Sequence, residues 1–147
     1  LFERTVTVAA SVASLADRRG FSYGVVSNAV ASYTGKWINV PIGASSSQLG
    51  MALEALAMAA PYVVAPLSEV INSERDSLPA GATVLLVTPS LSDTLIDDIA
   101  GIRSHGFPVL VLYTGDGLPE QDLGEIRVVP MSSVLDPLEA HEPVRAE

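Results

Sequence analysis

Four side chains that carry hydroxyl or carboxylate groups follow a short apolar stretch in the middle of the sequence. Residues 84–93 are VLLVTPSLSD, and the polar members are Thr88, Ser90, Ser92 and Asp93. In open α/β sheets, ligands bind beyond the carboxyl ends of the strands, so these residues are candidates for a recognition surface. The structural alternative is a helix cap, because Ser90 and Asp93 have capping spacing and lie just before an amphipathic stretch.

A second polar position follows the apolar stretch 108–113, in the sequence Gly115-Asp116-Gly117. Glycines around an acidic residue are typical of a tight turn, in which glycine supplies a positive φ. If 108–113 is a strand, Asp116 also lies at a carboxyl strand end. We therefore expect Asp116 to share the surface of Ser90.

Three consecutive serines, Ser45, Ser46 and Ser47, offer an alternative site for a small anion. They precede an apolar helical pattern, and helix N-termini bind anions. Ser45 and Gln48 also have the spacing of a capping box, which would use the serine structurally. No glycine-rich phosphate-binding signature accompanies them.

Catalytic and metal sites lack their usual signatures. Cysteine is absent, and the histidines are His105, in a Ser-His-Gly turn, and His141, near the end of the sequence. Ser90, His105 and Asp116 have the residue types of a Ser-His-Asp catalytic triad, but the sequence has no Gly-x-Ser-x-Gly motif that would expose a nucleophile. We expect no catalytic residue, no metal and no cofactor. Two aromatic residues, Tyr33 and Trp37, either anchor a partner or cover the edge of the core.

Composition and charge exclude some kinds of partner and of cellular location. Apolar residues make up 48% of the 147 residues, charged residues 17%, and the formal net charge is −9. One lysine and few arginines disfavour a nucleic-acid partner, which requires cations for its phosphates. No apolar stretch reaches the roughly 18–20 residues that span a bilayer. The sequence predicts a cytoplasmic domain, or the soluble part of a membrane-anchored protein.

Periodicity and turn residues predict a mixed α/β order. Residues 1–20 fit a helix better than a strand, because apolar positions recur at helical spacing and Gly20 can end it. Strands 21–30 and 36–42 would form a hairpin through residues 32–35, with Pro41 placing the second at an edge. The remaining predictions are helices at 49–60, 67–78 and 93–104, strands at 83–87, 108–113 and 125–129, and a short helix or acidic tail at 131–147. Unalternating apolar strands around a helix are typical of a parallel sheet. We expect a three-layer α/β domain over 1–130, with a mostly parallel sheet, helices on both faces and an edge hairpin.

An ordered series of motifs resembles a bacterial family, domain-of-unknown-function family fifty-eight. The first is the helix-to-strand segment 1–28, LFERTVTVAASVASLADRRGFSYGVVSN. It is followed by PIGASSSQLGMALEALA at 41–57, LPAGATVLLVTP at 78–89 and GFPVLVLY at 106–113. The resemblance covers about residues 2–113.

This resemblance implies a fold similar to von Willebrand factor A domains. It also implies a role as an adaptor or partner of a MoxR-type AAA ATPase, because family members are often encoded beside such enzymes. The metal loop of the related fold would follow a central strand that precedes Leu1, and Pro89 stands where its later aspartate would fall. The resemblance therefore implies no metal ligands in this chain.

A missing central strand would leave two facing edges open, one on the hairpin and one on strand 83–87. Unpaired backbone groups are costly when buried. We therefore expect a second copy or the chain's own tail to fill this position. Taken together, the sequence predicts a non-catalytic protein-interaction module with a strand-end surface at Thr88, Ser90, Ser92, Asp93 and Asp116. The alternative is a doubly wound α/β domain that binds a small anion or nucleotide at residues 45–47.

Overall fold

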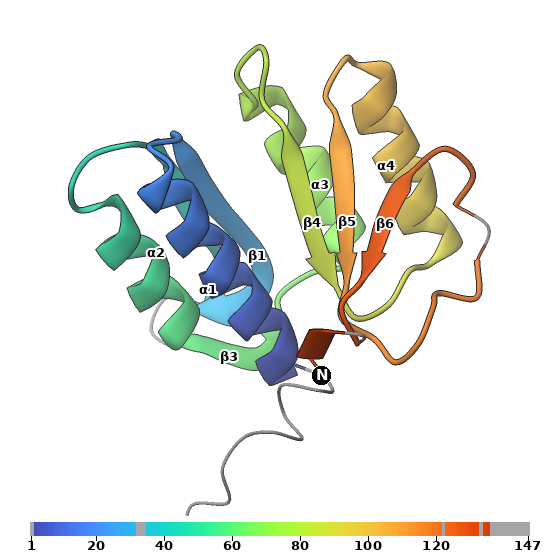
Figure 1. The fold of residues 1–147 in the computed structure, drawn as a ribbon, viewed down its shortest axis with the longest axis horizontal. Helices are drawn as coiled ribbons and strands as arrows, with labels where there is room; N and C mark the ends of the chain where they lie inside the picture. The colour runs from blue at the N-terminus through green and yellow to red at the C-terminus, as the bar shows by residue number, and fades with distance from the viewer. Residues whose placement is uncertain (1, 32–34, 122, 133, 136–147) are drawn as a thin grey trace, which may run out of the picture. The chain divides into compact units, whose positions relative to one another are not determined.

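The protein is described by a computed structural model that covers residues 2–31, 35–121, 123–132 and 134–135 (Figure 1). The chain divides into two compact units. The antiparallel unit comprises Phe2 and Val6–Pro79, and the parallel unit comprises Glu3–Thr5 and the chain from Ala80 onward. The elements in chain order are α1 (Phe2–Arg18), β1 (Tyr23–Ala31), β2 (Trp37–Gly43), α2 (Gln48–Ala57), β3 (Ala59–Val63), α3 (Leu67–Glu74), η1 (Arg75–Ser77), β4 (Val84–Thr88), α4 (Asp93–Ser104), β5 (Val109–Tyr113) and β6 (Arg127–Pro130).

The antiparallel unit is built on a three-stranded sheet in the order β2-β1-β3. The first segment of the chain is the helix α1, as its periodicity predicts, and Gly20 follows it with a φ of +74°. The strand β2, which contains Pro41, lies at an edge, which confirms that prediction. Residues 32–34 of the predicted hairpin turn lie outside the described residues.

Alternation along β2 distributes its side chains between the two faces of this sheet. Ile38 and Val40 are buried in one apolar cluster, together with Ala55 of α2. On the opposite face, the Glu74 carboxylate at the end of α3 accepts hydrogen bonds from Trp37 Nε1 (3.2 Å) and Asn39 Nδ2 (3.0 Å). Trp37 is therefore held by α3 within the unit, whereas Tyr33 lies outside the described residues.

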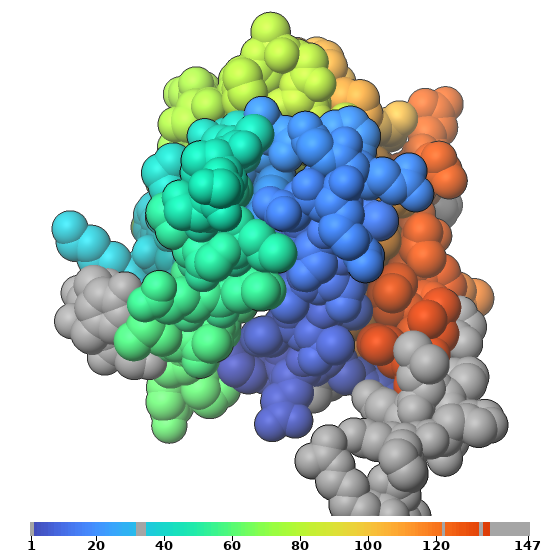
Figure 2. Space-filling view, turned by 60° about the vertical axis from the view of Figure 1, so that its left-hand side comes forward, coloured from blue at the N-terminus to red at the C-terminus, as the bar shows by residue number. Residues whose placement is uncertain are grey.

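The strand β3 was not predicted from the sequence. It contains Pro61, which interrupts a strand pattern, and it begins at Ala59, within the predicted helix 49–60, because α2 ends earlier than predicted, at Ala57. Its pairing with β1 makes β1 a central strand, so the hairpin edge expected to be open already has a neighbour. This stretch is strongly exposed and lies at the surface beside α2 (Figure 2), with Tyr62 and Val63 exposed by 72% and 68%.

The parallel unit contains the sheet β4-β5-β6, in which both strand pairs are parallel and in regular register. The helix α4 connects β4 to β5 and lies along one face of this sheet (Figure 1). The buried apolar side chains of the unit come from the strands, from α4 and from the neighbouring loops: Leu86, Leu91, Leu95, Ile99, Ile102, Val109, Val111, Leu112 and Ile126. Strands 83–87, 108–113 and 125–129 and helix 93–104 are thus confirmed.

The chain is mixed α/β, as expected, but its strands do not form one sheet. Among the described residues, hydrogen bonding joins β1 to β2 and β3, and β4 to β5. The sequence could not reveal this separation, because strand periodicity identifies strands and not their neighbours. Of the predicted C-terminal segment, Met131, Ser132, Val134 and Leu135 are described, and the last three are helical.

Candidate interaction surface at the strand ends

The hydroxyl of Thr88 shapes the loop that follows β4. Thr88 is only 4% exposed. Its Oγ1 donates a hydrogen bond to the carbonyl oxygen of Ser90 at 2.8 Å. The same Oγ1 accepts a hydrogen bond from the Ser90 backbone N–H at 3.4 Å. Thr88 therefore supports the predicted surface from below and does not line it. Ser90 is exposed.

Ser92 caps α4. Its side-chain oxygen accepts a hydrogen bond from Leu95 N at 3.1 Å, which satisfies one of the N–H groups that a helix leaves unpaired in its first turn. The capping expectation is thus correct for this helix, but the cap is Ser92 and not Ser90. Asp93 begins the helix and is exposed, and its negative charge complements the helix dipole there.

The end of β5 is fastened to the end of β4 by residues that the sequence pattern did not single out. Thr114 is completely buried, and its N–H donates to the Thr88 carbonyl at 2.9 Å. Its hydroxyl forms a 2.8 Å hydrogen bond with the Thr5 hydroxyl, which belongs to the same unit. Both buried hydroxyls at these strand ends therefore have internal partners.

Gly115 allows the two strand-end loops to approach each other closely. A Cβ atom at this position would lie 2.5 Å from the Pro89 carbonyl oxygen and 2.6 Å from the Tyr113 ring. The positive φ expected in this turn belongs to Gly117, at +65°. A single signal in the sequence, a glycine directly after a buried strand, could have indicated the close approach.

Asp116 projects from this fixed backbone into solvent. Its side chain is 92% exposed, and its carboxylate lies 3.8 Å from Arg4 Nη1. The Arg4 side chain is only 18% exposed, but the pair is long and open to solvent on its Asp116 side, so it contributes little stability. Because parallel strands end at the same edge of a sheet, Asp116 shares that edge with Ser90 and Asp93. The strand-end surface, defined here as Ser90, Ser92, Asp93 and Asp116, is exposed and carries two carboxylates.

The catalytic triad considered from the sequence is not assembled. Ser90 precedes α4 and His105 follows it, so the two lie roughly 18 Å apart, the length of a 12-residue helix. His105 Nδ1 is 2.7 Å from the Gly101 carbonyl oxygen, at the end of the helix. Among the described residues, no group of three or more His, Asp or Glu side chains is placed to hold a metal ion.

The three serines before α2 are exposed, and their hydroxyls interact locally. Ser45 Oγ lies 3.0 Å from Ser47 Oγ. The capping-box prediction is wrong: Ser47 is the N-cap residue, it makes no side-chain cap, and Gln48 turns inward. Its amide donates to the carbonyls of Tyr23 (2.5 Å) and Pro41 (3.0 Å), at an irregular end of the β1–β2 ladder.

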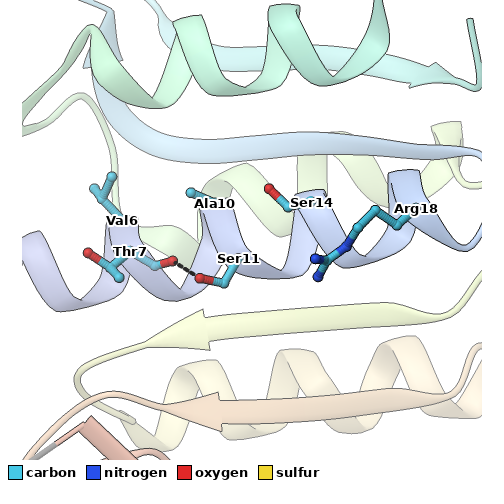
Figure 3. A pocket seen from close by; sticks show the side chains of 6 residues that line it. All are labelled: Val6, Thr7, Ala10, Ser11, Ser14 and Arg18. Carbon is cyan, nitrogen blue, oxygen red and sulfur yellow. Dashed lines mark hydrogen bonds between the residues drawn. The ribbon is translucent and has the colours of Figure 1, made fainter. Parts of the chain in front are cut away.

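A shallow hollow of about 420 Å³ lies along one side of α1 (Figure 3). All its lining residues come from this helix: Val6, Thr7, Ala10, Ser11, Ser14 and Arg18. Ser11 Oγ donates to the Thr7 carbonyl oxygen at 2.8 Å, so that hydroxyl has a partner within the helix. The hollow has one cation and no carboxylate or imidazole among its lining residues, which provides no acid–base pair.

The pKa of the Tyr23 hydroxyl is shifted. Partial burial raises the pKa of Tyr23, and a hydrogen bond from its hydroxyl to Asp17 Oδ1 (3.2 Å) and the charge of that carboxylate raise it further. The Tyr23–Asp17 pair joins the end of α1 to the start of β1. Its position there, distant in sequence from the strand-end loops, indicates a structural role.

Among the described residues, no helix combines the length and the apolarity that crossing a membrane requires. Comparisons of the chain with protein-family models, with curated proteins and with solved structures found no match.

Proposed function

We propose that the chain is a non-catalytic protein-interaction module that binds a partner through the strand-end surface. The observation that carries this proposal is the combination of a closely packed backbone with exposed charge. Gly115 packs against the Pro89 carbonyl, while the Asp116 side chain is 92% exposed. A backbone that is already packed before binding loses little conformational entropy when a partner engages the carboxylate next to it.

The partner in this proposal is a MoxR-type AAA ATPase, for which the chain acts as an adaptor. The support is the resemblance of the motifs at 1–28, 41–57, 78–89 and 106–113 to domain-of-unknown-function family fifty-eight, together with its implied von Willebrand A-like fold. The same family implies the cytoplasmic part of a membrane-anchored protein. The acidic strand-end surface would meet a basic surface on the ATPase, and this attraction would raise the association rate. High salt would screen the attraction and lower the rate.

The test is a binding measurement with a purified MoxR-type ATPase from the same organism, with nucleotide present. Asp116→Lys is the test variant, and Glu125→Lys is its matched control. Both positions carry an acidic side chain more than nine-tenths exposed, paired with one arginine at 3.8 or 3.9 Å, and the two lie at opposite ends of the parallel sheet. We expect Asp116→Lys to weaken binding by about tenfold or more and Glu125→Lys to leave it unchanged. Equal affinity of both variants, or no binding by the wild-type chain, would contradict the proposal.

A second candidate is a small anion bound at Ser45, Ser46 and Ser47. It is favoured by an α2 N-terminus that has no side-chain cap and no acidic residue in its first turn. Calorimetric titration with inorganic phosphate and with nucleotides separates the two candidates. Saturable binding that is lost when all three serines are replaced by alanine would favour the anion site over the interaction module.

A further inference from the structure

The loop between β5 and β6 is fastened at two points to the loop that follows β4. At its start, the lack of a side chain at Gly115 lets the Pro89 carbonyl oxygen come within 2.5 Å of where a Cβ atom would lie. Further along, the side-chain amide of Gln121 donates a hydrogen bond to the carbonyl oxygen of Leu91, a residue only 4% exposed. Both contacts lie within the parallel unit. Residues 115–121 therefore form a loop whose two ends are held against residues 89–91.

The sequence between these two points restricts the backbone as well. Gly117 has a φ of +65°, which glycine adopts without steric cost. The ring of Pro119 fixes its own φ and disfavours the helical conformation of the residue before it, which is Leu118. Leu118 thus stands between a turn glycine and a proline, and its backbone has few conformations available.

Leu118 lies at the surface of this loop. With a 73% exposed side chain, it is the most exposed large apolar residue of the part of the chain that the structure describes. Asp116 and Glu120, on either side of it in the loop, are exposed as well. A single exposed leucine is common on protein surfaces. An apolar side chain on a restricted backbone, with charged neighbours, has the composition of an interface contact, in which an apolar centre is surrounded by a polar rim.

The charge distribution of the chain indicates the chemistry of the partner. The parallel unit contains twelve acidic and four basic residues and the antiparallel unit five and four, so almost all of the net charge of −9 belongs to the parallel unit. The loop 115–121 itself contains two carboxylates and no basic residue. A partner that covers Leu118 must place cations beside these carboxylates, because like charges across an interface repel.

We propose that residues 115–121 are a preformed recognition loop, in which Leu118 is the apolar contact with the partner and Gln121 is a positioning residue. The partner surface is an apolar pocket flanked by lysine or arginine side chains, which pair with Asp116 and Glu120. This inference rests on the proposed function and deepens it, since Asp116 belongs to the strand-end surface. A loop that is ordered before binding loses little conformational entropy on binding, and the hydrogen bond from Gln121 supplies part of that order.

The contact role of Leu118 is tested by calorimetric titration of the full chain with the purified MoxR-type ATPase, with nucleotide present. Leu118→Ala is the test variant, and Leu15→Ala, at a 47% exposed leucine of α1, is its matched control. We expect Leu118→Ala to weaken binding about tenfold and Leu15→Ala to leave the affinity unchanged. Leu118→Met, which keeps most of the apolar volume, should restore most of the affinity.

The outcomes separate this inference from the proposed function. Wild-type affinity of Leu118→Ala, together with weakened binding of Asp116→Lys, would overturn the recognition loop and leave the proposed function standing. A wild-type chain that does not bind the ATPase would overturn both.

The positioning role of Gln121 is tested with Gln121→Met, which keeps the length of the side chain and removes its donor. We expect about fivefold weaker binding with an unchanged enthalpy and a less favourable entropy, because the loop must then be ordered during binding. The loss should be smaller in the Leu118→Ala background, since an ordered loop without its contact residue contributes less. Equal losses in both backgrounds would indicate a purely structural role and overturn the assignment of Gln121.

The order of the loop backbone in the free chain tests the inference without a partner. Nitrogen-15 relaxation should give order parameters of about 0.85 for the amides of residues 116–118 and 120, and Gln121→Met should lower them below about 0.6. Wild-type values below about 0.6 would overturn the preformed loop even if the ATPase binds the chain.

Discussion

Replacing Gln48 by glutamate should destabilise the antiparallel unit in a pH-dependent way. Gln48 is 2% exposed, and its amide nitrogen donates to the carbonyls of Tyr23 and Pro41. A carboxylate of the same shape offers these two acceptors no donor and brings a negative charge next to them. Burial and the loss of donors both disfavour ionisation, so the pKa of the introduced carboxyl should rise above the usual glutamate value of about 4.3.

The size of the effect has two parts. Loss of the amide donors removes two part-buried hydrogen bonds, which contribute about 0.5–1.5 kcal/mol each. The second part comes from the difference between the pKa of the introduced carboxyl in the folded and in the unfolded state. Each unit of this difference costs about 1.4 kcal/mol when the carboxyl is ionised. Because the folded-state pKa exceeds the unfolded one, the protonated form favours folding. The deficit is smallest below about pH 4.3, grows as the pH rises and levels off above the folded-state pKa.

Urea unfolding followed by fluorescence measures this effect, because the single tryptophan, Trp37, lies in the antiparallel unit. Gln48→Met is the matched control, since it removes the same donors without adding an ionisable group. We expect Gln48→Met to lose about 1–3 kcal/mol at every pH, and Gln48→Glu to lose more at pH 7 than at pH 4. A Gln48→Glu deficit that does not change with pH would refute the bridging role of this amide.

Three further predictions concern other parts of the chain. Ser92→Ala should lower the free energy of unfolding by about 1 kcal/mol, because it removes the side-chain cap of α4. Thermal denaturation measures this loss, and Ser92→Asp, which keeps a capping oxygen, is the control. Gly115→Ala should destabilise the parallel unit, because its Cβ would lie 2.5 Å from the Pro89 carbonyl oxygen; a melting temperature equal to wild type would contradict the close approach. The Tyr23 hydroxyl should titrate above the usual tyrosine pKa of 10.0, so its contribution to stability is present below that value and is lost as the pH rises through the folded-state pKa. Asp17→Asn should move this pKa back toward 10.0 in a spectrophotometric titration.

The local spacing of apolar residues was sufficient to predict most of the helices and strands. The helix α4 has the bounds that its periodicity predicts, and β4, β5 and β6 begin or end within one or two residues of prediction. These elements could be predicted because side-chain spacing differs between helices and strands over a few residues. The strand β3 could not, because Pro61 interrupts the strand pattern.

The composition of the candidate surface was partly evident from the sequence. Polar residues after an apolar stretch do lie at the strand ends, and one of them, Ser92, is a cap. Only the tertiary structure decides that the Thr88 side chain faces inward, since exposure depends on what packs above a residue. The role of Thr114, whose partner Thr5 is 109 positions away, has no local signal at all.

The sequence by itself determined the element types, the mixed α/β class and the net negative charge, because each depends on residues close together or on composition alone. The tertiary structure decided how the described strands are shared between two sheets, which of them lie at a sheet edge and which side chains are buried. Those properties depend on contacts between distant segments. The central place of β1, between β2 and β3, therefore appears only when the hydrogen-bonded neighbours of every described strand are known.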